Sequence, residues 1–252
     1  MKIKQSIITL VFVAITLPFA AFANTGAELR SANIDLHDKG SLQRGAKYFV
    51  NYCQGCHSLK FSRYNRVALD LGLTEDQVKN NLIFTRDKKG DPSKIGSLMV
   101  NALDKEAAAA WFGSPPPDLS LVGRSRGPDW IFSYLNAFYA DPSRPMCVNN
   151  TVFPNVGMPH VLVGLQGLQE LEENHGEHKH EHAAPKFVLH EKGSMSPAQY
   201  EEMTRDLTNF LTYVGEPAGL HRKQYGIWVM LFLGVLFIFA YLLKKEYWKD
   251  VH

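Results

Sequence analysis

The sequence has few cysteines and no large excess of either charge. Three Cys in 252 residues are too few to hold a domain of this size together with disulfides. Lys and Arg number 27 against 25 Asp and Glu, and the formal net charge of +2 excludes a strongly basic nucleic-acid-binding protein. A hydrophobic fraction of 45% excludes a disordered chain. We therefore expect one sizeable globular domain with appendages, and no nucleic-acid partner.

Long apolar runs are also scarce, and a mean hydropathy of −0.18 excludes a polytopic membrane protein. The first of only two such runs lies at the N-terminus. It follows Lys2 and Lys4 and ends in the small-x-small sequence of residues 21–23. This pattern predicts a signal peptide over residues 1–23, cleaved after Ala23. A retained N-terminal anchor is the alternative.

The second apolar run covers residues 225–243 and contains no charged side chain. At 1.5 Å per residue, a helix of this length spans about 28 Å, which matches the hydrocarbon thickness of a bilayer. Three Lys in the tail, residues 244–252, place that tail in the cytoplasm by the positive-inside rule. We predict an exported domain over residues 24–224 with a C-terminal transmembrane helix. A buried core helix is the alternative.

The exported domain has several helical patterns and few alternating ones. We expect helices at residues 41–51, 74–82, 104–112, 128–138 and 196–215, where capping residues precede apolar positions at helical spacing. Long irregular stretches separate them, notably residues 113–127 and 141–164. Loops of this length in a compact domain need something to organise them, which indicates a cofactor. The predicted fold class is mainly α, with long loops wrapped on one group.

A CxxCH pattern identifies that group. Cys53 and Cys56 can each form a thioether with one haem, and His57 is then placed as an axial ligand to the iron. A thioredoxin-like CxxC would need a βαβ setting, which the sequence does not show. A zinc site would need two more ligands, and only Cys147 remains besides scattered His. We predict one covalently bound haem c.

The second axial ligand decides between electron transfer and substrate binding. Met158 lies in a loop between Gly157 and Pro159, where a thioether can closely approach a metal. A His/Met pair would raise the reduction potential and close the iron to outside ligands. Met158 is the predicted ligand, and Met146 and His160 are the alternatives.

With these motifs in place, the sequence resembles the cytochrome c1 family, the membrane-anchored haem subunits of cytochrome bc1 complexes, in a bacterial form. The resemblance covers the whole mature chain, with the motifs in family order. The residues that carry it are Arg44, Gly45, Tyr48, the CxxCH at 53–57, the PPPDLS segment at 115–120, the RSRG segment at 124–127, the Met158 loop, and the single span after residues 215–217.

The resemblance implies further contacts with the haem. Arg126 matches the family position that pairs with a haem propionate, although Arg124 could do so instead. Pro115 and Pro116 would form a stiff apolar wall against the haem edge, since proline presents no N–H group. Gly45 would let the first helix of the domain cross the last one closely.

The resemblance also implies a function as a one-electron carrier. The donor would be the Rieske iron–sulfur protein, the acceptor a cytochrome c, and the cytochrome b subunit a neighbour in the membrane. The haem domain would lie on the periplasmic side of the bacterial inner membrane. No catalytic acid, base or nucleophile is expected in this subunit. Two alternatives remain: a membrane-anchored cytochrome shuttle outside any bc1 complex, and a haem sensor or peroxidase-like enzyme with an open iron site.

Two features lie outside the family pattern. Cys147 is a third, unpaired cysteine, which we expect to be an inert buried thiol; a regulatory thiol is the alternative. Residues 166–190 form a His-rich polar insertion, in which His175, His178 and His182 would share one face of a helix and could bind Zn or Cu. A solvated polar segment is the expected state of this insertion.

Overall fold

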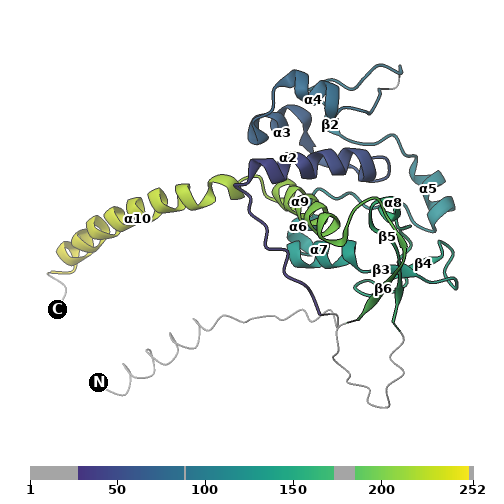
Figure 1. The fold of residues 1–252 in the computed structure, drawn as a ribbon. Coiled ribbons are helices and arrows are strands. Elements are labelled where there is room, and N and C mark those ends of the chain that lie inside the picture. Colours follow the sequence, from purple (N-terminus) through teal and green to yellow (C-terminus); the bar gives the residue numbers. More distant parts are fainter. Residues whose placement is uncertain (1–27, 88, 173–184, 250–252) are drawn as a thin grey trace, which may run out of the picture.

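The computed structural model describes residues 28–87, 89–172 and 185–249 of the chain (Figure 1). The predicted signal peptide lies outside these ranges. So do the histidines considered above as ligands for Zn or Cu, His175, His178 and His182.

Helices dominate the described residues, as the sequence predicts. The longer ones are α2 (Lys39–Tyr48), α9 (Pro197–Gly215) and α10 (Gly219–Tyr247). The shorter ones are α3 (Tyr64–Leu71), α4 (Glu75–Asn81), α5 (Lys105–Phe112), α6 (Val122–Ser125), α7 (Pro128–Asn136) and α8 (Val163–Gln166), and a π-helical turn, η1 (Phe49–Cys53), continues α2. The strands pair as antiparallel ribbons: β1 (Leu59–Arg63) with β2 (Leu98–Met99), β3 (Phe138–Ala140) with β4 (Val148–Asn150), and β5 (Gly167–Leu171) with β6 (Phe187–Lys192).

The core forms where α2 crosses α9 (Figure 1). Gly45 lies at the crossing, where an added Cβ would overlap the carbonyl oxygen of Asp206 and lie 2.7 Å from the Cβ of Phe210. Phe49 is fully buried, and its ring centroid is 5.8 Å from that of Phe210. The predicted close crossing of the first and last helices of the domain is therefore confirmed.

Two of the predicted helices begin with a capping box. The Thr74 hydroxyl accepts from the backbone N–H of Gln77 at the start of α4, and the Gln77 side chain accepts from the backbone N–H of Thr74. Ser196 and Gln199 make the same reciprocal pair before α9, with a proline at the first helical position. These bonds satisfy backbone N–H groups that the first turn of a helix leaves without partners.

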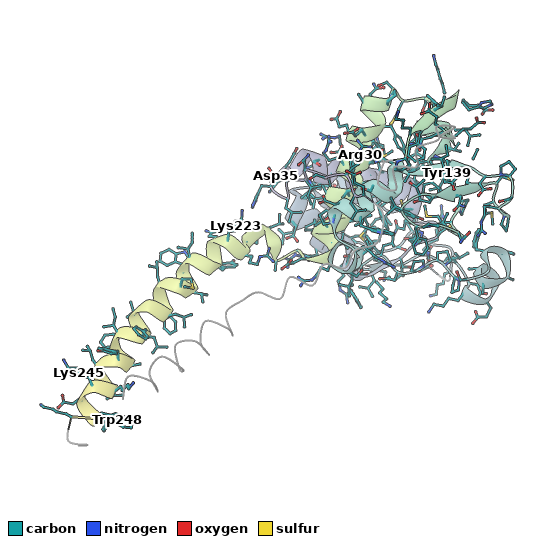
Figure 2. The ribbon with its side chains drawn as sticks, turned by 90° about the horizontal axis from the view of Figure 1, so that it is seen from below. Arg30, Asp35, Tyr139, Lys223, Lys245 and Trp248 are labelled. Carbon is teal, nitrogen blue, oxygen red and sulfur yellow. The ribbon has the colours of Figure 1, made fainter. Side chains whose placement is uncertain are left out.

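Helix α10 projects away from the domain as one long rod (Figure 2). Lys223 lies at the domain end, and Lys245 and Trp248 lie at the far end. The helix has 29 residues, a mean hydropathy of 2.5 in its most apolar stretch, and no buried residue in that stretch. It contains the predicted span, residues 225–243, and its exposed apolar surface is unlike that of a core helix.

The two ends of the predicted polar insertion form strands, and most of the residues in these strands are exposed. β5 and β6 pair as a hairpin. At its base an added Cβ on Gly193 would overlap the carbonyl oxygen of Leu165, so the two chains approach closely there. The Gln169 side chain donates to the carbonyl oxygens of Asn136 and Phe138, at 3.1 and 2.8 Å. These bonds fix the hairpin to the end of α7. This helix ends at Asn136, before the predicted limit of residue 138, because Phe138 begins β3.

Candidate haem site

The CxxCH segment forms a tight turn at the end of η1. The backbone N–H groups of Cys56 and His57 both donate to the carbonyl oxygen of Cys53, at 3.1 and 2.8 Å. Cys53 is buried, whereas Cys56 and His57 are half-buried. The turn holds both thiols and the imidazole close together in the chain, which is the arrangement that two thioethers and one axial ligand to a single haem require.

The environment of Cys53 does not suit a redox-active dithiol. Burial, and secondarily the neighbouring Cys56, raises the pKa of the Cys53 thiol to about 12. Reactive cysteines in CxxC motifs depend on a lowered pKa, because the thiolate is the nucleophile. The thioredoxin-like alternative is therefore disfavoured by the site itself as well as by the absence of a βαβ unit among the described residues.

His57 is oriented by the proline-rich segment. Its Nδ1 lies 2.7 Å from the carbonyl oxygen of Pro117. A carbonyl can only accept, so Nδ1 carries the proton and donates, which leaves the Nε2 lone pair available to a metal. Burial lowers the pKa of His57, which favours the neutral imidazole that ligates iron.

The rest of the PPPDLS segment is attached to the chain that follows His57. The backbone N–H of Leu119 donates to the carbonyl oxygen of Ser58 at 2.9 Å, and the backbone N–H of Lys60 donates to the Asp118 carboxylate at 3.0 Å. Pro115 is exposed and Pro116 is half-buried. The structure therefore gives the segment a definite role in holding His57, while contact of Pro115 and Pro116 with a haem edge stays a prediction.

Met158 lies in a second cluster, formed by the buried Phe138, Val148 and Val156. The Tyr134 hydroxyl donates to Met158 Sδ at 3.3 Å. Burial raises the pKa of Tyr134, so this hydroxyl stays protonated and can act as a donor. Neither Tyr134 nor its contact with Met158 was foreseen from the sequence.

The two predicted axial ligands are connected by one short segment. An added Cβ on Gly157, next to Met158, would lie 3.5 Å from the carbonyl oxygen of Phe112. Pro117, which holds His57, follows Phe112 by five residues, a reach of at most about 18 Å. The structure thus brings the His57 and Met158 regions to opposite ends of the segment 112–117.

The two alternatives to Met158 are placed differently. The His160 ring stacks on Phe138, with centroids 4.9 Å apart and an interplanar angle of 3°. Burial lowers the pKa of His160 to about 4. Met146 packs against the same cluster as Met158 but makes no hydrogen bond among the described side chains. The sulfur of Met158 is the one held by a directed donor.

The two arginines considered as partners of a haem propionate, Arg124 and Arg126, have different surroundings. Arg124 pairs with Glu216, with 3.0 Å between Nη1 and Oε2. The Arg126 guanidinium carbon lies 5.0 Å from the centroid of Trp130 and 6.0 Å from that of Phe153. Arg126 forms no ion pair with any described residue, so its hydrogen-bond donors are free for a propionate.

The expectation for Cys147 was wrong. Its side chain is exposed, and its backbone has φ of 55°, in the left-handed region. The N–H of Cys147 donates to the carbonyl oxygen of Arg144 in a tight turn between β3 and β4. The turn directs the side chain outward, although apolar neighbours in the sequence suggested burial.

The donor set fits a haem. Two adjacent thiols, an imidazole with a free Nε2 and a thioether are the groups that a covalently bound, six-coordinate haem requires. Within the described ranges, no group of three or more His, Cys, Asp or Glu side chains lies close enough to hold a metal ion. The zinc alternative therefore has no ligand set there.

A mainly α domain with this donor set and one long apolar helix defines a membrane-anchored c-type cytochrome. Residues 30–251 match the model of the cytochrome C1 family, and the chain belongs to that family. It is the haem-bearing electron carrier of a bc1 complex, of bacterial type, and holds a covalently bound haem c.

Two relatives named cytochrome c1 support this assignment. The chain is 56% identical to cytochrome c1 of Allochromatium vinosum, over 93% of this chain and 95% of that one. It is 31% identical to cytochrome c1 of Rhodospirillum rubrum, over 85% and 83% of the two chains. It is also 44% identical to a Nitrosomonas europaea protein named ammonia monooxygenase gamma subunit, over 96% and 97%.

Proposed function

We propose that this subunit binds its haem through Cys53 and Cys56, with His57 and Met158 as the axial ligands. The bound haem supplies the one-electron couple. The observation that carries the proposal is that both ligating side chains are held by the protein: His57 by the Pro117 carbonyl and Met158 by the Tyr134 hydroxyl. Ligands fixed in this way keep the iron closed and the reorganisation on electron transfer small.

Arg126 is the proposed partner of a haem propionate. Its stacking on Trp130 holds the guanidinium at a fixed place without using its N–H groups. Arg124 is already engaged with Glu216, which favours Arg126 over it. Pro115 and Pro116 are proposed to lie along the haem edge.

The proposed electron donor is the Rieske iron–sulfur protein, and the proposed acceptor is a cytochrome c. The cytochrome b subunit is the expected neighbour of α10 in the membrane. Redox partners of this kind meet through small, transient, polar interfaces. The identity of the partners rests on family membership.

We place the haem domain on the periplasmic side of the inner membrane and the C-terminus in the cytoplasm. Lys244 and Lys245 lie in the last turn of α10, and positive charge at the end of a span favours the cytoplasmic side. Residues 1–23 are proposed to be a signal peptide that exports the domain.

A reduced-minus-oxidised visible spectrum tests the assembly. The protein would be affinity-purified from mildly solubilised native membranes. A c-type band together with b-type haem and an iron–sulfur subunit is expected. A c-type band alone, under several detergents, would favour a free shuttle. The same experiment distinguishes a bc1 complex from a different assembly. The Nitrosomonas relative, for example, is named as a subunit of ammonia monooxygenase.

Met158→Ala tests the ligand. Loss of the thioether should leave a high-spin iron that binds carbon monoxide in the ferrous state. Met146→Ala is the matched control, since Met146 packs on the same cluster. If Met158→Ala stays low-spin with an unchanged potential, Met158 is not the ligand.

A further inference from the structure

Two aromatic neighbours fix the position of the Tyr134 ring. Its ring stacks on Trp130, with centroids 4.9 Å apart and planes 9° apart. Phe138 also packs against the Tyr134 ring, in an edge-on arrangement with centroids 5.2 Å apart and an interplanar angle of 71°. Trp130 and Tyr134 are four residues apart in α7 and so share one side of the helix, and Phe138 follows in β3. Because the ring is fixed by these contacts, the position of the Tyr134 hydroxyl is fixed as well.

The loop that contains Met158 is attached to the same residue. Asn150 is buried, and its side-chain N–H donates to the carbonyl oxygen of Tyr134 at 2.8 Å. Its side-chain oxygen accepts from the backbone N–H groups of Val152 and Phe153, at 2.9 and 3.1 Å. Asn150 thus links the backbone of Tyr134 to the start of the Met158 loop.

A second asparagine fixes the loop further along. Asn149 is also buried, and its side-chain oxygen accepts from the backbone N–H of Asn155 at 2.9 Å. Its N–H donates to the Asp141 carboxylate at 2.9 Å. Hydrogen bonds therefore fix the backbone of the loop at both ends of residues 150–155. Met158 follows this fixed backbone, and its Sδ accepts the hydrogen bond from the Tyr134 hydroxyl.

We propose that Tyr134 is a positioning residue for Met158, and that its hydrogen bond to Sδ raises the reduction potential of the haem. This inference rests on the proposed ligation by Met158. A thioether sulfur has two lone pairs, so Met158 Sδ can accept the hydrogen bond from the Tyr134 hydroxyl with one of them and keep the other for a metal. With haem bound, the hydrogen bond would fix the orientation of the second lone pair and would withdraw charge from the sulfur.

The direction of the effect follows from the charge of the iron. A sulfur that has given up charge to a hydrogen bond is a weaker donor, and the oxidised iron loses more stabilisation than the reduced iron. The potential is therefore higher with the hydrogen bond than without it. Haem potentials respond in general to axial ligands and to hydrogen bonds around them.

Tyr134→Phe tests this, because it removes only the hydroxyl and keeps the ring that packs on Trp130 and Phe138. The measurement is a redox titration of the full-length holoprotein in its purified complex. The equilibrium constant for reduction should fall by up to about tenfold, which is a fall of up to about 59 mV for one electron. The near-infrared sulfur-to-iron charge-transfer band should shift, while the iron stays low-spin.

Tyr213→Phe is the matched control. Tyr213 is buried in the same domain, and its hydroxyl donates to the Asp70 carboxylate at 2.8 Å, away from Met158. This variant should lose stability but keep the wild-type potential and charge-transfer band. A general loosening of the core would affect both variants and would therefore be recognised.

The outcomes separate this inference from the ligand assignment. If Met158→Ala opens the iron but Tyr134→Phe has the wild-type potential, or a higher one, the role of Tyr134 is refuted and the ligand stands. If Met158→Ala leaves the iron low-spin, the ligand assignment fails first. A fall in potential with Tyr134→Phe, absent in Tyr213→Phe, would support the proposal.

Discussion

Gly45→Ala should destabilise the domain, although alanine is the better helix former. An added Cβ would overlap the carbonyl oxygen of Asp206, a backbone atom that no side-chain rotation can move away. The closest ordinary approach of carbon to a carbonyl oxygen is about 3.3 Å, so the two helices would have to separate by roughly 1 Å. Separation would loosen the packing of Phe49 on Phe210.

The size of the effect can be estimated. Overpacking of this kind costs up to about 3 kcal/mol. The higher helix propensity of alanine relative to glycine offsets about 1 kcal/mol of this loss in the free energy of unfolding. The net loss of about 2 kcal/mol corresponds to a fall in Tm of roughly 4–8 °C for a domain of about 200 residues.

The assay is thermal denaturation of the full chain in detergent, followed by circular dichroism. Gly40→Ala is the control in the same helix, because an added Cβ there would meet only the side-chain ends of Asp38 and Arg44, at 3.3 and 3.4 Å. Gly40→Ala should be neutral or slightly stabilising. A Gly45→Ala protein as stable as the Gly40→Ala protein would refute the close crossing as the reason for glycine.

Two further predictions concern ion pairs of α9. Arg44→Met should lower the free energy of unfolding by about 2–3 kcal/mol in chemical denaturation. The Asp206 carboxylate is only 5% exposed and would lose its partner, since Arg44 Nε lies 2.6 Å away. The Arg44→Met/Asp206→Asn double variant should recover most of this stability, and failure to recover it would contradict the mechanism. The hydrogen bond from Arg30 is the main cause of a lowered pKa of Glu201. The ionised Glu201 therefore contributes to stability above pH 4.5, the ordinary pKa of a glutamate, and this contribution is lost as the pH falls through the lower pKa of the folded state. Glu201→Gln should therefore flatten the acid limb of the stability–pH curve, and a curve parallel to that of the wild type would count against this ion pair.

The parts of the site that local patterns determine could be predicted from the sequence. CxxCH places two thiols and an imidazole in one turn by its spacing alone, and the turn is found at residues 53–57. Capping residues predicted the starts of α4 and α9, because the bonds that begin a helix are local. The apolar run of α10 was equally clear, since hydropathy does not depend on the rest of the fold.

The contacts that hold the two proposed ligands, His57 and Met158, could not be predicted, because they join distant parts of the chain. Pro117 is 60 residues from His57, and Tyr134 is 24 residues from Met158. Nothing in the sequence around Tyr134 marks its hydroxyl as a donor to sulfur. A pair of adjacent asparagines at 149 and 150 was the available signal for a fixed loop, because buried Asn side chains often bond to nearby backbone.

The positions of the short strands could not be predicted, for a related reason. β3 and β4 have three residues each, too few for alternation to be visible, and they pair only because a turn brings them together. Cys147 lies in that turn with positive φ. Its exposure is a property of the turn, so its apolar sequence neighbours gave the wrong expectation.

Glu216 connects the haem-binding domain to the membrane helix. One of its carboxylate oxygens lies 3.0 Å from Arg124 of α6 and the other 2.6 Å from Arg222 of α10. α9 ends at Gly215 and α10 begins at Gly219, so the connection is very short. Exposed ion pairs contribute little to stability, so the consequence is mainly geometric. A short link with a carboxylate shared by two guanidinium groups restricts how the domain can turn relative to its anchor, and it engages Arg124, which leaves Arg126 as the arginine available to the haem.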